Sequence, residues 1–354
     1  MSSKSYDTIV IGGGQAGLAS GYHLQNQGLS YLILESQPEA VGSWPRYYDS
    51  LKLFSPARYS SLPGMEFPGE MGNYPRRDDV ISYFKQYAKR FSLSVKANEH
   101  IVQVRQEDGR FNIYTASGNT YVSKTIINAT GSFHSPYTPR INGTDKFKGK
   151  VIHSSVYRNA EPYKNQRVIV VGRGNSAVQI AIELADVSQT SLAVLKPVHF
   201  TKQRILGKDI HFWFRLTGLD TFPFWRFGIK SPNPASVIDL DNYKNRIDAC
   251  NPDQKTMFNA FYSEGVIWPN GEKEKVDSVI FATGYKSSLF HLEGLGAVDE
   301  NGDPLQKGGV STAVPGLYYV GLYGQRSFAS ATIRGVGSDA EYVVKQLMRY
   351  LKRT

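Results

Sequence analysis

Near the start of the sequence, a short apolar strand leads directly into a glycine-rich turn. Residues 7–11 read Asp-Thr-Ile-Val-Ile, and the next six residues are Gly12-Gly13-Gly14-Gln15-Ala16-Gly17. Residues 18–27 suit a helix, and residues 31–34 form a second apolar strand that ends at Glu35. A strand, a tight turn, a helix and a second strand make a βαβ unit, so the sequence predicts a parallel sheet.

Three of the four glycines of this turn have separate physical tasks in a dinucleotide site. Gly12 permits the tight turn, Gly14 lets the backbone approach a pyrophosphate, and Gly17 lets the helix pack closely on the strand. The helix N-terminus attracts the phosphate charge, and Glu35 stands where a carboxylate accepts hydrogen bonds from ribose hydroxyls. An ordinary glycine-rich turn is the competing interpretation, but the strand, the helix and the acid in these places favour the dinucleotide site.

The same pattern returns in the middle of the chain. Residues 168–171 are Val-Ile-Val-Val, the turn is Gly172-Arg173-Gly174-Asn175-Ser176-Ala177, and residues 178–185 suit a helix. The following strand ends at Leu195-Lys196 and has no carboxylate there. A carboxylate at this place would repel the 2′-phosphate of NADP. Lys196, with Lys202 and Arg204 shortly after it, is instead suited to bind that phosphate. A solvated charge at a strand end is the alternative for Lys196. The acid at the first site and the bases at the second predict FAD first and NADPH second, with hydride transfer between them.

Two such units predict an α/β fold with two nested Rossmann-like domains. Ala129-Thr130-Gly131 and Ala282-Thr283-Gly284 follow apolar strands, and we interpret both as crossings between the domains. The expected domains are an FAD-binding domain at 1–160 and 285–354 and an inserted NADPH-binding domain at 161–284. The remaining pattern predicts a helix over 78–91, an antiparallel meander over 101–105, 110–115 and 120–121, strands over 124–128, 192–195, 276–281 and 317–320, and a closing helix over 337–351.

Charge and cysteine content exclude several kinds of partner. Residues 101–230 hold 18 Lys and Arg against 8 Asp and Glu, while the rest of the 354-residue chain holds 23 of each. No nucleic-acid-binding module accompanies this excess, so a polyanionic small molecule is the expected partner. The single cysteine, Cys250, cannot form an internal disulfide or dithiol pair, and we expect no metal site. No apolar run reaches the roughly 18–20 residues that span a bilayer, and the first residues do not make a signal peptide, so we expect a cytoplasmic protein without an integral membrane segment.

A third motif lies between the two glycine turns. Residues 147–157 fit the pattern FxGxxxHxxxY, with Phe147, Gly149, His153 and Tyr157 at its fixed positions. With this motif the chain resembles the flavin-containing monooxygenases, including the short bacterial members described as cation-efflux-associated flavoproteins and the plant indole-pyruvate type. Gly42-Ser43-Trp44 after the first acid and Phe281-Ala282-Thr283-Gly284-Tyr285 also match, so the resemblance covers essentially the whole chain.

The resemblance implies roles for individual positions. The implied FAD contacts are Gly12, Gly14, Gln15, Ala16, Gly17, Glu35, Ser43, Trp44 and Ser55. The implied NADP contacts are Gly172, Gly174, Asn175, Ser176 and Lys196, to which Arg204, Thr283 and Gly284 are added by their place beside the second site. His153 and Tyr157 are candidate catalytic positions, but a structural role as organisers of the domain interface is the favoured interpretation. No acid/base pair, catalytic triad or metal cluster is apparent, so the chemistry would rest on the cofactors.

One departure from the family bears on activity. Phe54 stands where the animal enzymes usually have an asparagine near the C4a edge of the flavin, and a phenyl ring cannot donate a hydrogen bond to a peroxyflavin. The resemblance implies a monooxygenase that uses NADPH, FAD and O₂ to oxygenate soft sulfur or nitrogen atoms of small molecules. The alternatives are an NADPH oxidase or reductase, and a redox-sensing flavoprotein associated with cation efflux. A homodimer is one of the expected oligomeric states.

Aromatic residues are densest at 211–214 and 222–227, which read His-Phe-Trp-Phe and Phe-Pro-Phe-Trp-Arg-Phe. Three interpretations stay open for this cluster: an aromatic core of a cap on the second domain, a wall of the substrate site, and a contact with a membrane surface.

Overall fold

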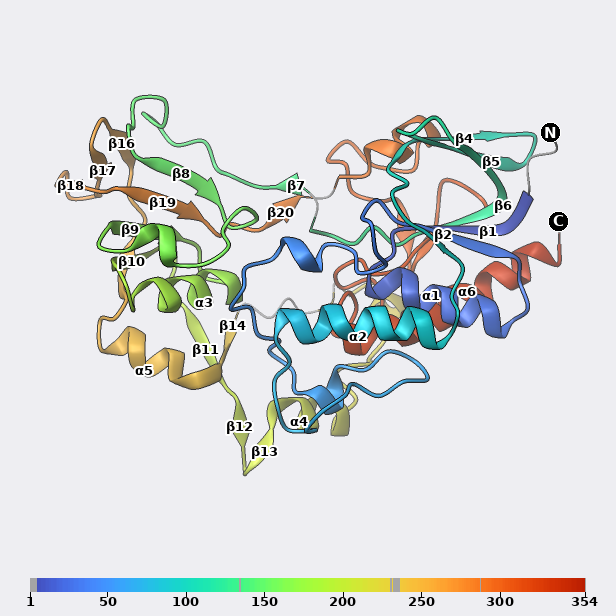
Figure 1. Ribbon diagram of the computed structural model, residues 1–354, viewed down its shortest axis with the longest axis horizontal. Coiled ribbons are helices and arrows are strands. Elements are labelled where there is room, and N and C mark those ends of the chain that lie inside the picture. The colour runs from blue at the N-terminus through green and yellow to red at the C-terminus, as the bar shows by residue number, and fades with distance from the viewer. Residues whose placement is uncertain (1–4, 134, 230, 232–235, 287, 354) are drawn as a thin grey trace.

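The chain folds around two sheets that are built mainly of parallel strands and lie beside each other (Figure 1). The computed structural model describes residues 5–133, 135–229, 231, 236–286 and 288–353. In that part of the chain, every helix is too short or too polar to cross a membrane. The mixed α/β architecture predicted from the two glycine turns is confirmed.

The first sheet has the strand order β21-β22-β23-β6-β1-β2-β3. Strands β23, β6, β1, β2 and β3 are parallel neighbours, and β4 and β5 add an antiparallel meander to β6. The bounds are β1 Ser5–Ile11, β2 Tyr31–Leu34, β3 Val95–Lys96, β4 Ile101–Glu107, β5 Arg110–Thr115, β6 Thr120–Asn128, β21 Gln306–Lys307, β22 Val310–Ser311 and β23 Leu317–Tyr319.

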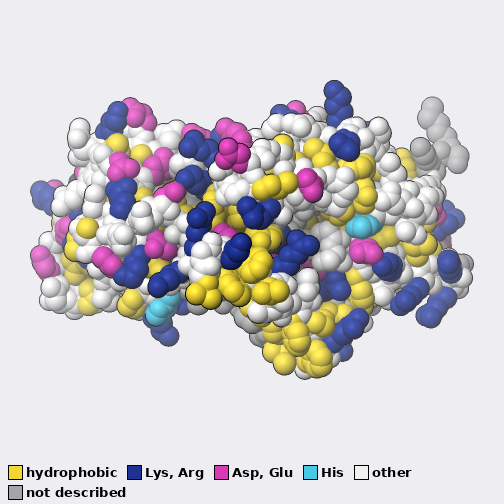
Figure 2. Space-filling view, turned by 90° about the horizontal axis from the view of Figure 1, so that it is seen from below, with side chains coloured by type: hydrophobic (Ala, Val, Ile, Leu, Met, Phe, Trp, Pro, Cys, Tyr) yellow, Lys and Arg dark blue, Asp and Glu magenta, His cyan; other side chains and the backbone are white. Residues whose placement is uncertain are grey.

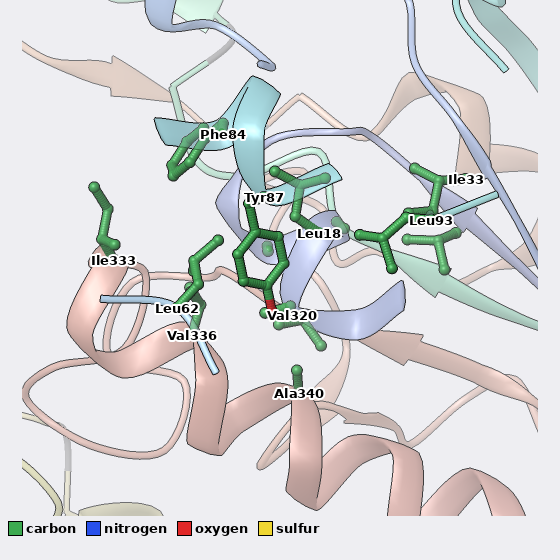
Figure 3. Close-up of a cluster of buried hydrophobic side chains, with 14 of the residues drawn as sticks. Leu18, Ile33, Leu62, Phe84, Tyr87, Leu93, Val320, Ile333, Val336 and Ala340 are labelled. Carbon is green, nitrogen blue, oxygen red and sulfur yellow. The ribbon is translucent and has the colours of Figure 1, made fainter. Parts of the chain in front are cut away.

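Helices α1 (Gln15–Asn26), α2 (Arg77–Arg90) and α6 (Ile333–Leu351) pack on one face of this sheet. Helix α6 turns apolar side chains inward at intervals of three and four residues, as an amphipathic helix requires. Figure 3 shows Ile333, Val336 and Ala340 of α6 facing Leu18 of α1 and Tyr87 of α2. The opposite face is covered by the meander β4–β5 and the 3₁₀ helix η6 (Phe290–Leu295).

The second sheet has the order β15-β10-β9-β19-β8, and each of these pairings is parallel. Its bounds are β8 Lys150–His153, β9 Arg167–Val171, β10 Gln189–Val194, β15 Asp253–Thr256 and β19 Ser278–Phe281. Helices α3 (Asn175–Leu184) and α5 (Tyr243–Asp248) lie on one face. The antiparallel sheet β16 (Ala260–Tyr262), β17 (Gly265–Ile267) and β18 (Lys273–Lys275) lies on the other.

Two short strands join the halves of the molecule. Strand β7 (Ser135–Pro136) pairs with β20 (Tyr285–Lys286) just after the two Ala-Thr-Gly segments, and Figure 1 shows this pair between the two sheets. Strand β8 pairs with β19, so the second sheet takes one strand from residues that the sequence analysis placed in the first domain. The exact domain limits stay a prediction.

A projection extends from the second half of the molecule at the bottom of Figure 1. It contains the hairpin β12 (Arg204–Ile205) and β13 (Lys208–Asp209) and helix α4 (Ile210–Leu216). Strands β11 (His199–Lys202) and β14 (Ser236–Asp239) pair at its base. The short 3₁₀ helices are η1 Trp44–Arg46, η2 Ala57–Tyr59, η3 Glu161–Tyr163, η4 Phe224–Phe227 and η5 Leu240–Asn242.

The predicted elements are present with shifted ends, and two predicted strands are one. Residues 120–128 form a single strand, β6, because its first part continues the antiparallel meander while its last part lies between β1 and β23. Ser123 belongs to both ladders, opposite Phe111 on one side and Tyr6 on the other. The sequence pattern changes between residues 121 and 124 because the strand changes its neighbours there, and not because the strand ends.

Candidate functional site

In the first glycine turn, packing requires glycine at the first and last positions of the motif, Gly12 and Gly17. Gly12 has φ +105°, and a Cβ added there would lie 2.7 Å from the carbonyl oxygen of Ala129. A Cβ on Gly17 would lie 1.9 Å from the carbonyl oxygen of Gly12. Only glycine therefore lets helix α1 approach strand β1 so closely.

Gly14 is different, because the fold does not need it. Its φ of −77° and ψ of −166° suit any residue, and an added Cβ would find Gly42 Cα at 3.6 Å as its nearest neighbour. Gly14 precedes α1 and lines a cavity of about 320 Å³. The empty space over Gly14 at a helix N-terminus is the place that a phosphate group would take.

Most of the predicted FAD contacts line this cavity. They are Gly12, Gly14, Gln15, Ala16, Glu35, Ser43 and Trp44. Gly17 lies beneath the turn instead. Ser55 is buried, and its hydroxyl lies 3.0 Å from that of Ser60. The structure therefore gathers residues from the glycine turn, the end of β2 and the Gly-Ser-Trp loop around one hollow.

Glu35 is fixed at the end of β2 by backbone groups. Gly13 N–H donates to Oε2 at 2.6 Å, and Gln37 N–H donates to Oε1 at 2.8 Å. The side chain is 3% exposed and lines the cavity. This placement is the one that the spacing from Gly12 predicts for a carboxylate facing a ribose.

The Gly-Ser-Trp loop is tied to the turn by a side-chain hydrogen bond. Trp44 Nε1 donates to Gln15 Oε1 at 2.8 Å, and Gln15 Nε2 donates to the carbonyl of Ala331 at 3.3 Å. Ala331 lies two residues before α6 and has φ +71°, in the left-handed region that a residue with a side chain seldom adopts. Gln15 thus links three segments that meet at the cavity.

Sequence reasoning missed several lining residues, of which two closely follow the Gly-Ser-Trp loop and the others come from distant segments. They include Arg46, Tyr47, Glu99, His100, Phe133, Phe290 and His291. Glu99 is 4% exposed, and although burial opposes it, hydrogen bonds from Tyr121 and its neighbours lower the pKa of this carboxyl below its usual range. No local pattern marks these residues. Thr130 and Gly131 also line the cavity, and their signal was the Ala-Thr-Gly segment itself.

The second glycine turn repeats the geometry of the first. Gly172 has φ +138°, and an added Cβ would lie 2.4 Å from the carbonyl oxygen of Ala282. Gly174 precedes α3 with φ −91° and ψ 179°, and an added Cβ would meet nothing within 4 Å. In both turns the first glycine therefore packs on the alanine of an Ala-Thr-Gly segment, while a Cβ on the middle glycine would clash with nothing.

The other predicted contacts of the second site lie around this turn. Asn175 and Ser176 open α3. The N–H of Gly172 donates to the carbonyl of Ala193 at 3.1 Å, so β10 ends beside the turn, with exposed Lys196 three residues further on. Thr283 hydrogen-bonds through its hydroxyl to the carbonyl of Tyr137. Arg204 lies on β12 in the projecting hairpin and is exposed, so its part in this site stays a prediction.

His153 and Tyr157 are buried and engaged in packing. His153 Nδ1 accepts from the N–H of Ser155 at 3.0 Å, so Nε2 donates to the carbonyl of Gly284, also at 3.0 Å. Burial lowers the pKa of His153, which favours this neutral form. Tyr157 is 1% exposed, and its pKa is raised by burial. Neither residue lines the first cavity, and this arrangement favours a structural role for both.

Phe54 belongs to a cluster that joins the two halves of the molecule. Its ring stacks on that of His211, with centroids 6.4 Å apart. His211 is 1% exposed and donates from Nδ1 to Asp209 Oδ1 at 2.8 Å, while its Nε2 has no hydrogen-bond partner in the part of the chain that the structure describes. The Tyr74 hydroxyl also donates to Asp209. Sequence reasoning found the aromatic run but missed this buried His–Asp pair.

The burial of His211 predicts a loss of stability in acid. Burial lowers the pKa of His211 below its ordinary value of 6.5, so the unfolded chain takes up the proton more readily than the folded protein. The stabilisation is therefore complete above about pH 6.5 and is lost as the pH falls toward the folded pKa. His23 and His153, whose pKa values burial also lowers, act in the same direction. We expect melting temperature to fall with pH in this range.

The substitution His211→Gln, which keeps a donor for Asp209, should make that fall shallower. The matched control is His199→Gln at an exposed position, which should leave the slope unchanged. Melting curves of the three proteins across this pH range test the assignment. An equal slope in His211→Gln and the wild type would contradict it.

Comparisons with known proteins place these features in a family. The family model described as pyridine nucleotide-disulphide oxidoreductase matches residues 9–205. An uncharacterised CzcO-like oxidoreductase of Geobacillus kaustophilus is 34% identical over 97% of this chain and 99% of that protein. The probable indole-3-pyruvate monooxygenase YUCCA1 of Arabidopsis thaliana is 28% identical over 96% of this chain and 89% of that protein.

Among solved structures, the flavin-containing monooxygenase from Stenotrophomonas maltophilia is similar in its whole length. It superposes with a TM-score of 0.87, at 30% identity, over 98% of this chain and 99% of that one. The bacillithiol disulfide reductase of Staphylococcus aureus superposes with a TM-score of 0.74 at 21% identity, which is a likeness of fold alone.

Proposed function

This chain belongs to the pyridine nucleotide-disulphide oxidoreductase family, in which its relatives include flavin monooxygenases, and from that premise we propose that it is an NADPH-dependent, FAD-containing monooxygenase. Its substrates would be small molecules with a soft sulfur or nitrogen atom, and O₂ would be the second substrate. Membership of an oxidoreductase family agrees with the motifs of the sequence. The single cysteine leaves no partner for an internal redox disulfide, which argues against a dithiol mechanism.

The observation that carries the proposal is the pair of open middle glycines. Gly14 and Gly174 each precede a helix that follows a parallel strand, and neither is required by packing. A residue that the fold does not require to be glycine, repeated at the same place in two turns, points to ligands that need the space. Two dinucleotides in one chain are what a hydride transfer from nicotinamide to flavin needs.

The residues around the first glycine turn suit FAD, and those around the second glycine turn suit NADPH. Gly14, Gln15 and the N-terminus of α1 would hold the FAD pyrophosphate, and Glu35 would accept hydrogen bonds from a ribose of FAD. Gly174, Asn175 and the N-terminus of α3 would hold the NADPH pyrophosphate, with Lys196 toward the 2′-phosphate. Bound FAD supplies the redox chemistry, since it can accept a hydride and pass electrons to O₂. The protein supplies binding, orientation and the exclusion of water.

Lys196 predicts a preference for NADPH over NADH. A charge-assisted contact to phosphate is worth roughly 1.5–3 kcal/mol, or about ten- to a hundredfold in affinity. We expect Lys196→Ala to raise the KM for NADPH by that factor and to leave the KM for NADH nearly unchanged. The control is Lys273→Ala, an exposed lysine of β18. Steady-state kinetics with both nucleotides decide the matter, and equal use of both by the wild type refutes the role of Lys196.

Phe54 predicts poor coupling between NADPH oxidation and product formation. If Phe54 occupies the place of an amide donor near the flavin, a missing hydrogen bond in a water-poor site costs on the order of 1–3 kcal/mol. We expect Phe54→Asn to lower the hydrogen peroxide formed per NADPH, whereas Phe54→Leu, which has no donor, should not. A higher peroxide yield in both Phe54→Asn and Phe54→Leu than in the wild type would show that the ring protects the flavin and that this prediction is wrong.

The proposed function is tested by a balance of NADPH, peroxide and product. Purified protein loaded with FAD is supplied with NADPH and air, with and without a thioether or a tertiary amine. We expect the acceptor to increase NADPH consumption and to be recovered as its oxide. NADPH consumption that ends entirely as peroxide would indicate an oxidase, and binding of both nucleotides without consumption would indicate a sensor.

A further inference from the structure

The projection at the bottom of Figure 1 exposes more apolar surface than its packing explains. Its segment, residues 202–229, starts with the hairpin β12–β13 and helix α4 and continues into residues 220–229, which include the 3₁₀ helix η4 and pack on α6 through Asp220–Arg334 and Trp225–Tyr342. The exposed large apolar side chains of this segment are Ile205, Leu206, Leu216, Phe222, Phe227 and Ile229. Figure 2, which views the molecule from this side, shows apolar side chains gathered at the centre and the lower edge, with Lys and Arg beside them.

The exposed charges of the same segment have one sign. They are Lys202, Arg204, Lys208, Arg215 and Arg226. None of these five forms an ion pair within the described ranges of the chain. The excess of cations in the middle of the sequence is thus partly concentrated on this projection.

The two acids of the segment face inward, where they have partners. Asp209 pairs with His211 and Tyr74, as described above. Asp220 lies 3.1 Å from Arg334, and the two side chains are only 12% and 8% exposed. The acids therefore do not offset the outer cations, and the surface presented to a partner is apolar and purely cationic.

The tip of the hairpin presents a leucine at a conformational cost. Leu206 has φ +48°, in the left-handed region, and is followed by Gly207 at φ +71°. Asn or Gly is the usual choice in such a two-residue turn. The Leu206 side chain is 85% exposed, so it contributes almost nothing to the core. The tip is held in place from within, since Trp213 Nε1 donates to the carbonyl of Ile205 at 2.9 Å.

We propose that this projection is a docking surface for an anionic lipid membrane. Exposed leucine, isoleucine and phenylalanine side chains would enter the boundary between headgroups and acyl chains, and the surrounding Lys and Arg would bind anionic headgroups. Trp213 and Trp225, which lie within the same segment, are residues favoured at that boundary. The contact is peripheral, because the described helices include none that could span a bilayer. This inference is independent of the proposed chemistry.

Charge decides between the lipid surface and the other occupants. In a dimer with two-fold symmetry the same patch would face itself, so five cations would oppose five cations. A nucleic acid would satisfy the cations but would leave the exposed apolar side chains in water. An anionic bilayer satisfies both properties of the surface at once.

The test uses the FAD-loaded full chain and sedimentation with vesicles. One set of vesicles is phosphatidylcholine alone, and the other is phosphatidylcholine with phosphatidylglycerol in a three-to-one ratio. The variant Leu206→Ser/Lys208→Glu alters the hairpin tip. The matched control is Val102→Ser/Arg105→Glu, which likewise replaces one apolar and one basic side chain by serine and glutamate, at exposed positions of β4 in the first sheet. Neither pair lies in the proposed FAD or NADPH site, so NADPH oxidation should be unchanged in both.

We expect the wild type and the control to bind the anionic vesicles, to bind neutral vesicles weakly, and to be released by salt. The affinity of the tip variant for the anionic vesicles should be lower by a factor of roughly ten or more. Three results would each overturn the proposal: no binding of the wild type to anionic vesicles at low salt, an equal loss in the control variant, or a dimer in solution that the tip variant abolishes. Tighter binding of the wild type to duplex DNA than to anionic vesicles would also overturn it.

Discussion

The variant Gly14→Val should yield a folded protein that contains no FAD. Gly14 has backbone angles that suit valine, and an added Cβ would have only an ordinary contact, 3.6 Å from Gly42 Cα. The side chain would instead occupy the space over the N-terminus of α1. Losing two charge-assisted hydrogen bonds to the pyrophosphate, at about 1.5–3 kcal/mol each, weakens binding by roughly 10²- to 10⁴-fold.

The measurement is the ratio of flavin to protein absorbance after purification, with circular dichroism as the check on folding. Gly14→Ala should lie between the wild type and Gly14→Val. Gly17→Ala is the contrasting control, because its Cβ would lie 1.9 Å from the Gly12 carbonyl oxygen and should disrupt the fold itself. A Gly14→Val protein that is folded and still yellow would show that the cavity is not the FAD site.

The variant Gly174→Val should retain FAD but lose its reaction with NADPH, and so give a yellow protein that NADPH no longer reduces. A Cβ at this position meets nothing within 4 Å, and φ −91° with ψ 179° suits a β-branched residue. The fold and the FAD site should therefore be intact, while the space for the second pyrophosphate is filled. We expect loss of NADPH-dependent flavin reduction by a factor similar to that lost at the first site.

Anaerobic mixing with NADPH, followed at the flavin absorbance band, measures this loss. Dithionite, a small reductant that needs no nucleotide site, should still reduce the flavin of Gly174→Val and serves as the control. Loss of flavin from Gly174→Val, or reduction by NADPH at the wild-type rate, would contradict the assignment of separate sites to the two turns.

The parts of the fold that the sequence predicts are those with a local physical cause. The turn at Gly12 needs a glycine in the left-handed region, and the close approach of α1 to β1 needs Gly17. Both requirements are therefore visible within a stretch of six residues. The same is true of Gly172 in the second unit. Glu35 could be placed because a strand of fixed length carries it from the turn to the edge of the cavity.

The parts that could not be predicted depend on contacts between distant segments. Glu99 lies just before the meander and Phe290 opens η6, and no periodicity in the sequence marks either of them as a lining residue. His211 and Asp209 are close in sequence, but the pair is packed against Phe54 and hydrogen-bonded to Tyr74, which lie more than a hundred residues away. Strand β8 joined the second sheet because Val151 and Ile152 pair with β19, a choice that its sequence alone leaves open.

The resemblance to flavin-containing monooxygenases is confirmed by relatives that cover nearly the whole chain. The structure adds the reason that its two glycine turns behave alike. In each, the first glycine packs on an alanine of an Ala-Thr-Gly segment, at Ala129 and at Ala282. Both proposed cofactor sites are thus built at a point where the chain passes from one sheet to the other.

In a monooxygenase, one atom of O₂ reaches a soft acceptor at the expense of NADPH. Turnover with a thioether under ¹⁸O₂, with mass spectrometry of the sulfoxide and an assay of the NADPH consumed, measures this transfer. We predict that the sulfoxide oxygen is ¹⁸O and that its amount rises in proportion to the NADPH consumed. Consumption of NADPH with all the labelled oxygen recovered as hydrogen peroxide, and none in the sulfoxide, would contradict the proposed function.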